Sequence, residues 1–237
     1  VVNQAIKTNS ASIAYTYTEP TIFFEYSFDT AKIAKDNGLK NVYVTNGFMT
    51  PEMLAMFEPY LDAANVDIKA FREEPYRRLM GGRLEPVLES CRLMKIMGIW
   101  LEITTLIVPG VNDDPEELQE LAAFIVEDLG PETPWHLSRF FPNYKMRDRR
   151  PTDEGLLYRT KKMGESLGLN YIYIGNVFGD NNTYCKNCGQ KLISRHGYSV
   201  DVVGLDSKGY CRNCRTKMDG VGLSLSGFDH PGIRCRH

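Results

Sequence analysis

The chain has 237 residues, with 43% apolar side chains, 24% charged side chains and a formal net charge of −2. This length suits one large domain, alone or with a small appendage, and the apolar fraction is enough for a core. The near-neutral charge argues against nucleic acid as a partner. No apolar run approaches the roughly 18 residues of a membrane span, and no secretion signal is recognisable at the start.

The first residues predict a helix, because Val1, Val2, Ala5 and Ile6 form an apolar stripe. The chain opens on valine rather than methionine. We therefore expect a fragment that lacks its N-terminal part.

Six segments are rich in the β-branched and aromatic residues that favour strands. They are residues 12–17, 41–44, 64–69, 100–108, 135–140 and 171–174. Helical patterns alternate with them, and the best-defined one follows Asp114, which suits a cap, with Pro115 in the first position and Gly130 at the end. The other helices begin near Thr21, Pro51, Leu84 and Thr152.

This alternation predicts a parallel sheet with helical crossovers, arranged as a partial or full α/β barrel. A doubly wound nucleotide fold is not expected, because the Gly-x-Gly-x-x-Gly and P-loop motifs are absent. From about Phe178 the hydrophobic periodicity disappears. We expect three parts: a partial barrel over 1–178, a four-cysteine metal-binding ribbon over 179–219 and a loose tail over 220–237.

Polar residues stand at three of the predicted strand ends, namely Glu19, Thr45, Asn46, Asp67 and Lys69. The carboxyl ends of parallel strands meet at one edge of the sheet, where α/β folds bind their ligands. We therefore expect these residues to converge on one small-molecule site. Each also has a plain structural explanation, as a helix cap, a turn or an ordinary salt bridge.

Two Cys-x-x-Cys pairs follow the barrel, with 22 residues between them. The four cysteines are Cys185, Cys188, Cys211 and Cys214. A two-residue spacing lets one tight turn aim two thiolates at an ion, and a second turn completes a tetrahedron, so the pattern favours zinc. Reduced structural thiols, a redox pair and an iron–sulfur site are the alternatives. Without a secretion signal, the pairs favour metal over disulfides and hence a reducing, cytoplasmic location.

The remaining cysteines carry less information. Cys91 lies on an apolar helix face and is expected to be a buried, inert thiol. Cys235 and His237 are assigned no role.

Five motifs occur in order at strand ends. They are Tyr-Thr-Tyr-Thr-Glu-Pro-Thr (15–21), Val-Thr-Asn-Gly-Phe (44–48), Val-Asp-Ile-Lys (66–69), Leu-Ile-Val-Pro-Gly-Val-Asn-Asp (106–113) and Phe-Pro-Asn-Tyr (141–144). With these motifs the chain resembles radical S-adenosylmethionine (SAM) enzymes of the pyruvate formate-lyase activating enzyme type. It looks closest to the AmmeMemoRadiSam system branch, whose C-terminal part also carries an Asn-Thr-Tyr-Cys-x-x-Cys-Gly segment like residues 182–189 here.

The resemblance implies a partial (βα)6 barrel without its first strand and with the active site inside the strand carboxyl ends. Thr18 and Glu19 match the family's Gly-Gly-Glu motif, although Tyr17 and Thr18 replace the two glycines. The carboxylate of that motif accepts hydrogen bonds from the methionine ammonium of SAM. Lys69 matches a lysine that pairs with the carboxylate of the cofactor.

The remaining cofactor-binding positions are also implied by the resemblance. Thr45, Asn46 and Asp67 would line the ribose side or hold a nearby cation. Thr104 falls where the family's fifth strand approaches the cofactor, and Asn143 and Tyr144 fall where its last strand approaches adenine and ribose.

One departure concerns the iron–sulfur cluster. The family binds a 4Fe–4S cluster through Cys-x-x-x-Cys-x-x-Cys after its first strand, and this triplet does not occur in the 237 residues. The region that should hold it would lie before Val1. Either the chain is truncated or the protein has lost the cluster, and we expect this polypeptide alone to be inactive.

For the intact protein, the resemblance implies an oxidoreductase in which a 4Fe–4S cluster cleaves SAM reductively to a 5′-deoxyadenosyl radical. That radical abstracts hydrogen from a substrate, either a glycine in a partner protein or a small molecule. A flavodoxin or ferredoxin would supply the electron.

The alternative is a non-catalytic zinc-ribbon binding module on a degenerate barrel, which the sequence upstream of Val1 would distinguish. A metal-dependent hydrolase is disfavoured, because His136 alone of the four histidines lies in the predicted barrel.

Overall fold

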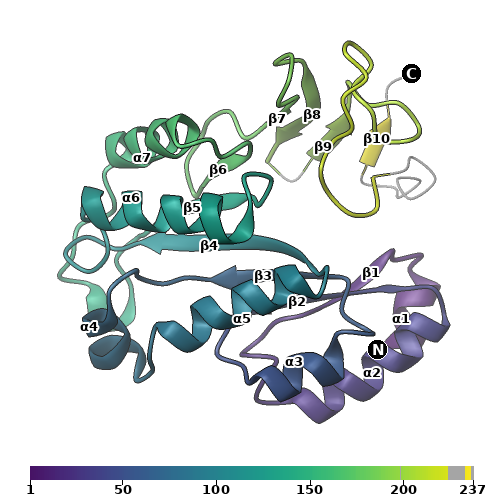
Figure 1. The fold of residues 1–237 in the computed structure, drawn as a ribbon, viewed down its shortest axis with the longest axis horizontal. Coiled ribbons are helices and arrows are strands. Elements are labelled where there is room, and N and C mark those ends of the chain that lie inside the picture. The colour runs from purple at the N-terminus through teal and green to yellow at the C-terminus, as the bar shows by residue number, and fades with distance from the viewer. Residues whose placement is uncertain (198, 224–232, 236–237) are drawn as a thin grey trace. The chain divides into compact units, whose positions relative to one another are not determined.

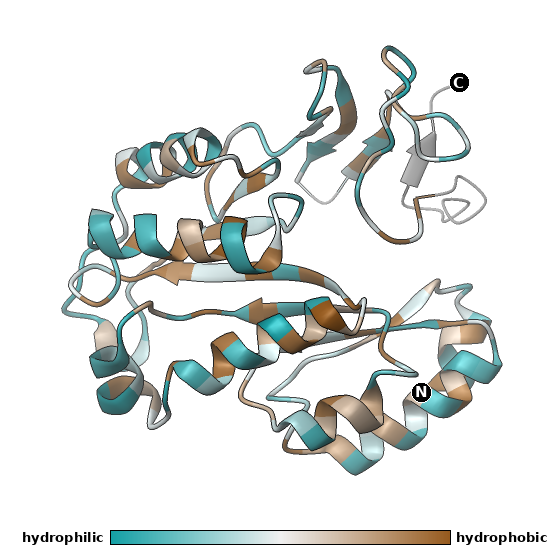
Figure 2. Cartoon of the chain, in the orientation of Figure 1, coloured by the Kyte–Doolittle hydropathy of each residue, from teal (hydrophilic) through white to brown (hydrophobic). Residues whose placement is uncertain are grey.

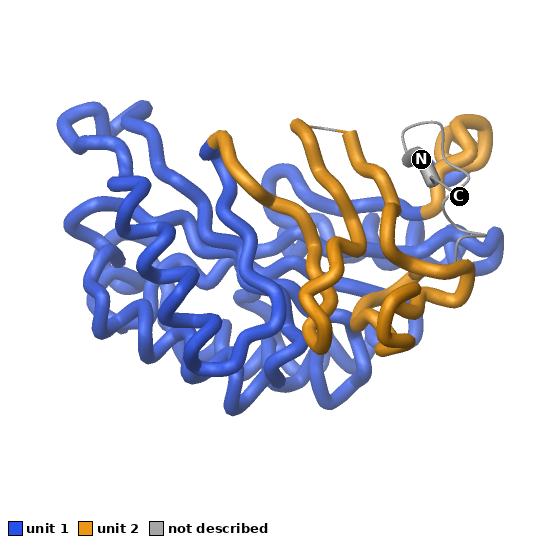
Figure 3. Tube along the Cα trace, turned by 90° about the horizontal axis from the view of Figure 1, so that it is seen from above, with its two compact units in different colours: residues 1–2, 12–177 blue, residues 3–11, 178–237 orange. Residues whose placement is uncertain are grey.

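The computed structural model describes residues 1–197, 199–223 and 233–235. The chain forms two compact units, coloured separately in Figure 3: residues 1–2 with 12–177, and residues 3–11 with 178–237. A short helix, α1 (Val2–Lys7), begins the chain. The domain boundaries predicted after residues 178 and 219 stay predictions.

A six-stranded parallel sheet forms the centre of the first unit, in the order β1 to β6 (Figure 1). Its strands are β1 (Ser12–Tyr15), β2 (Lys40–Thr45), β3 (Ala63–Asp67), β4 (Trp100–Ile107), β5 (Trp135–Arg139) and β6 (Ile172–Gly175). All six predicted strands are therefore present, and the predicted α/β class is confirmed. Because consecutive parallel strands joined by right-handed crossovers place their helices on one face, this order is that of a partial barrel rather than a doubly wound sheet.

Five longer helices connect the strands, and in Figure 2 they carry both hydrophobic and hydrophilic residues. They are α2 (Phe24–Asp36), α3 (Pro51–Phe57), α5 (Glu85–Ile96), α6 (Pro115–Phe124) and α7 (Glu154–Ser166). Asp114 caps α6 as predicted, since its carboxylate accepts the backbone N–H groups of Glu116 and Glu117 at 2.9 Å. None of the described helices is both long and apolar enough to cross a bilayer.

The helix-covered face of the sheet holds the core. Tyr43 of β2 is fully buried, and its ring lies 4.6 Å from that of Phe57 of α3. A Cβ on Gly164 of α7 would meet Trp135 of β5 and Ile172 of β6, so these side chains also point toward the helices. Strand side chains alternate between faces, and the neighbours of these residues therefore point the other way.

The opposite face, here called the open face, is polar. It carries side chains that are only partly buried, on four neighbouring strands. They include Asn65, Asp67, Glu102, Thr104, His136 and Tyr173. The register pairs Asp67 with Thr104 and Thr104 with His136, so these residues form a row across the sheet.

The second unit contains a four-stranded sheet in the order β10-β9-β8-β7. Its strands are β7 (Thr183–Tyr184), β8 (Lys191–His196), β9 (Ser199–Val202) and β10 (Ile233–Cys235). Leu192, Val202 and Leu205 pack with Cys185 and Cys211 in a small core.

Two of the elements that were not predicted matter most for the site and the tail. One is the short helix α4 (Glu73–Pro75) with the π-helical turn Tyr76–Met80 that follows it. The other is β10, which pairs with β9 inside the stretch expected to be a loose tail. Residues 224–232 and 236–237 of that predicted tail, including His237, lie outside the described residues.

Candidate functional site

Glu19 is the acceptor of a hydrogen-bond network that joins the ends of β1 and β2. Its Oε1 accepts the hydroxyl of Thr45 at 2.6 Å, and its Oε2 accepts the backbone N–H of Asn46 at 2.7 Å. Thr21 donates two longer bonds to Oε1, from its N–H at 3.3 Å and its hydroxyl at 3.2 Å. The structure thus brings together three of the predicted site residues.

The Glu19 side chain is buried without a countercharge. The residue is only 9% exposed, and no lysine, arginine or histidine of the described chain forms an ion pair with it. Burying a carboxylate is unfavourable unless hydrogen bonds and an opposite charge compensate for its lost hydration. The hydrogen bonds are present and the opposite charge is not, which suits an ammonium group of a ligand.

Lys69 lies two residues beyond the end of β3, next to Asp67. Its Nζ is 2.8 Å from Oδ2 of Asp67, and the two side chains are 43% and 37% exposed. An ion pair this exposed contributes little to stability. The pair is the ordinary salt bridge that the sequence left open as an alternative, and its exposure leaves the ammonium accessible to an anion.

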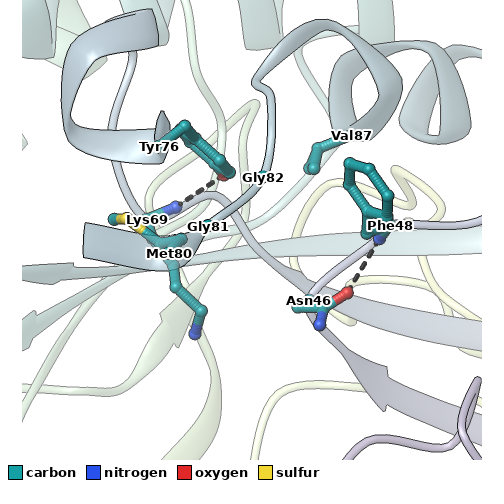
Figure 4. Close-up of a pocket in the computed structure, with 8 residues that line it drawn as sticks. All are labelled: Asn46, Phe48, Lys69, Tyr76, Met80, Gly81, Gly82 and Val87. Carbon is teal, nitrogen blue, oxygen red and sulfur yellow. Dashed lines mark hydrogen bonds between the residues drawn. The ribbon is translucent and has the colours of Figure 1, made fainter. Parts of the chain in front are cut away.

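A pocket of about 360 Å³ lies at this edge of the sheet, within the range of small-molecule sites (Figure 4). Asn46 and Lys69, which follow neighbouring strands, both line it. The other lining residues are Phe48, Tyr76, Met80, Gly81, Gly82 and Val87. Glu19 does not line the pocket and contacts it through Asn46.

Part of the pocket wall was not predicted. Tyr76, Met80, Gly81 and Gly82 come from the turn after β3, whose sequence has no regular periodicity. The Tyr76 hydroxyl accepts the backbone N–H of Lys69 at 3.2 Å (Figure 4), and burial raises the pKa of Tyr76 to about 12. The phenol is therefore neutral at physiological pH.

The other predicted cofactor residues lie in different surroundings. Thr104 donates to Oδ1 of Asn65 at 2.8 Å on the open face. Thr18 is exposed. Asn143 caps its own turn by accepting the N–H of Tyr144, whose side chain is 76% exposed. Neither Asn143 nor Tyr144 lines the pocket.

The four predicted metal ligands come together in the second unit. The Sγ atoms of Cys185, Cys188, Cys211 and Cys214 all lie within 4.8 Å of one another, and the Cys185–Cys214 and Cys188–Cys211 pairs are 3.5 and 3.7 Å apart. Four thiolates at about 2.3 Å from one tetrahedral ion stand about 3.8 Å apart. The cluster therefore fits a single ion.

Both cysteine turns have the same backbone geometry. Cys185 N–H donates to Gln190 O at 2.8 Å, and Cys211 N–H donates to Thr216 O at the same distance. The fourth residue after each of these cysteines, Gly189 or Arg215, has a positive φ. The repetition indicates two equivalent turns that each aim two thiolates at one point.

A 4Fe–4S cluster does not fit these cysteines. Its thiolates bind four separate iron atoms and so stand farther apart than thiolates that share one ion. Cys91 is no substitute, because it is fully buried in the helix-covered core and burial raises its thiol pKa to about 12. Among the described residues, no cysteine triad suits such a cluster.

Comparison with known proteins agrees with this fold. The family model described as the Radical SAM superfamily matches residues 1–124. An uncharacterized protein of Methanocaldococcus jannaschii is 43% identical over 224 residues, which are 93% of this chain and 66% of that protein. The chain thus spans slightly less than two thirds of the length of this curated relative.

Two solved structures share the fold. A domain of the pyruvate-formate lyase-activating enzyme from Bacteroides vulgatus has a TM-score of 0.60 at 17% identity, covering 70% of this chain and 100% of that chain. SuiB of Streptococcus suis, bound to S-adenosylmethionine, has a TM-score of 0.58 at 13% identity, and the match covers 75% of this chain and 42% of that chain.

Proposed function

Because the chain belongs to the Radical SAM superfamily, we propose that it is the SAM-binding part of a radical SAM oxidoreductase of the activating-enzyme type. Within that type we assign it to the AmmeMemoRadiSam system branch, on the five sequence motifs and the cysteine segment 182–189. SAM would bind at the pocket beside the ends of β2 and β3.

One observation carries this proposal: Asn46 and Lys69 line the same pocket, and Asn46 is bonded to a buried carboxylate that forms no ion pair with any described residue. In the proposed complex, the methionine end of SAM extends from the pocket past Asn46 to Glu19, which accepts its ammonium, and Lys69 binds its carboxylate. A zwitterionic amino acid needs one anion and one cation in this way. Thr18, Thr45, Asp67, Thr104, Asn143 and Tyr144 are proposed to complete the site.

The chain's own share of the reaction is binding and orientation. When bound, SAM and a reduced 4Fe–4S cluster supply the one-electron chemistry that removes a hydrogen atom from a substrate. The described residues do not fit that cluster, and we propose that its ligands come from residues outside these 237. On this account the chain alone does not cleave SAM.

The partners follow from the same proposal. An electron donor such as a flavodoxin or ferredoxin reduces the cluster in the cytoplasm, and the substrate is a partner protein or a small molecule. For the four cysteines we propose zinc, which is the usual ion of structural four-cysteine sites, and their spacing supports a single tetrahedral ion.

Formation of 5′-deoxyadenosine tests the proposal. The full-length protein, purified anaerobically and reduced with dithionite, is expected to form 5′-deoxyadenosine and methionine from SAM. Lys69→Ala should slow this reaction, whereas Lys40→Ala should not. Lys40 is the first residue of β2, at the end of the strand away from the pocket, and it pairs with Asp62. A full-length protein that forms no 5′-deoxyadenosine and has no cysteine triplet would support the non-catalytic module instead.

A further inference from the structure

Asn112 belongs to the motif at 106–113 and is buried to 1% exposure in the loop that follows β4. Its Nδ2 donates to the backbone oxygen of Lys69 at 2.7 Å and to that of Leu106 at 2.9 Å. Its Oδ1 accepts the N–H of Val108 at 2.6 Å. Both amide hydrogens and the amide oxygen of this side chain are therefore used to join β4 to the segment that carries Lys69.

That segment needs such support because β3 has already ended. Ile68 still bonds to the sheet, since its N–H donates to Thr104 O at 3.0 Å. The N–H of Lys69 goes instead to the Tyr76 hydroxyl, and its carbonyl goes to Asn112. Two residues on, the N–H of Phe71 donates to the buried Glu117 at 2.5 Å. Side chains thus replace the strand ladder along this segment.

The same segment sets the direction of the Lys69 side chain. Its neighbours Ile68 and Ala70 are buried to 0% and 1% exposure, whereas the Lys69 side chain is 43% exposed and lines the pocket. In an extended segment, alternate side chains point to opposite sides. The backbone at Lys69 therefore sets the side from which the side chain leaves the segment, and the contact with Asp67 holds its ammonium.

We propose that Asn112 is a positioning residue that acts through Lys69. By holding the Lys69 carbonyl, it fixes the ammonium where the carboxylate of an amino-acid-like cofactor binds. This inference rests on the proposed function, because the ligand is taken to be SAM. Asn112 does not line the pocket, so its effect on affinity passes through the lysine.

A second buried asparagine provides a matched control. Asn41 is fully buried and has the same bonding pattern, with Nδ2 donating to Ala31 O and Tyr60 O and Oδ1 accepting the Tyr15 hydroxyl. It lies near the start of β2, away from the strand ends that form the pocket. Asn41→Ala should lower stability as Asn112→Ala does, because each leaves buried polar groups without partners.

The experiment is a double-mutant cycle on SAM affinity, measured by calorimetry with the full-length protein. Asn112→Ala and Asn112→Asp should each weaken SAM binding by about three- to tenfold, the range expected for one lost hydrogen bond. The aspartate keeps the acceptor for Val108 and removes the donor to Lys69. In a Lys69→Ala background neither change should weaken binding further, and Asn41→Ala should leave the affinity unchanged.

If neither Asn112 variant folds, Tyr76→Phe removes the other backbone bond of Lys69 and should show the same dependence on the lysine.

The outcomes separate the two proposals. If wild type does not bind SAM, or Lys69→Ala binds it as wild type does, the proposed function fails. If Lys69→Ala weakens binding but Asn112→Ala and Asn112→Asp do not, the positioning role fails. The role is also refuted if the Asn112 and Lys69 effects add, or if Asn41→Ala weakens binding equally, since either result indicates general damage to the fold.

Discussion

The backbone N–H of Asn46 donates a 2.7 Å hydrogen bond to the carboxylate of Glu19. This bond ties the first residue after β2 to the loop that follows β1, and Asn46 lines the same pocket as Lys69. The carboxylate therefore shapes the pocket wall, and its charge is left without a cation in the described protein. In our account the ligand's ammonium supplies that cation.

Glu19→Gln tests the role of this charge. The amide keeps a hydrogen-bond acceptor for Thr45 or Asn46 but no longer attracts an ammonium, so SAM affinity should fall by roughly tenfold to a hundredfold. The free energy of unfolding should change by no more than about 1 kcal/mol, since an uncompensated buried charge is removed together with part of its hydrogen bonding.

Calorimetry and urea unfolding measure the two effects, with Glu58→Gln as a control at an exposed carboxylate. Unchanged SAM affinity in Glu19→Gln would show that the carboxylate is a structural acceptor alone.

The six strands were predictable because local composition determines them. Each is a short run of β-branched and aromatic residues, and the strand order follows from the regular alternation with helices. The polar strand ends were equally visible, since Glu19, Asn46 and Lys69 interrupt apolar runs.

The rest of the site depends on contacts between distant residues. The bonds from Asn112 and Tyr76 to the backbone of Lys69 join separate segments, and no local pattern indicates them. The turn that carries Tyr76 has no hydrophobic periodicity. The part of the pocket wall that this turn forms could therefore not be predicted from the sequence. Asn143 and Tyr144 were assigned from a family resemblance, and in the structure the Asn143 side chain accepts the N–H of Tyr144. Their cofactor role stays a prediction.

Glu117 makes stability depend on pH. Burial raises its pKa above the ordinary 4.5, and the hydrogen bond from Phe71 N–H offsets this only in part. A carboxyl with a raised folded-state pKa stabilises the fold below its unfolded pKa, and this contribution is lost as the pH rises through the folded-state pKa.

Wild type should therefore lose stability as the pH rises from about 4 to about 7, and Glu117→Gln should not. The free energy of unfolding of Glu117→Gln minus that of wild type should thus increase over this range. Glu117→Ala should lose about 1–3 kcal/mol of unfolding free energy at either pH, because the partly buried N–H of Phe71 is left without an acceptor. Urea unfolding at pH 4 and pH 7 measures these free energies. If the difference in unfolding free energy between wild type and Glu117→Gln is the same at both pH values, Glu117 does not make stability depend on pH.

The four-cysteine cluster should hold about one zinc ion per chain, as expected for a closed tetrahedral site. Cys211→Ala should lose that zinc, and hydrogen exchange should then show lost protection in β8, while β3 and β4 stay protected. Cys91→Ala removes an equally buried thiol that is not part of the cluster, and it should keep the metal. Zinc retained by Cys211→Ala, or absent from wild type, would refute the assignment of a zinc ion to these four cysteines.

The most direct test of the SAM site compares SAM with decarboxylated SAM, which lacks the group assigned to Lys69. Calorimetry on the full-length protein should show wild type binding SAM at least about tenfold more tightly than the decarboxylated compound, as expected when a charge-assisted hydrogen bond is lost. Lys69→Ala should bind the two compounds equally, while Lys40→Ala should discriminate as wild type does. If Lys69→Ala keeps the full preference for SAM, the lysine does not bind the carboxylate and the proposed site is wrong.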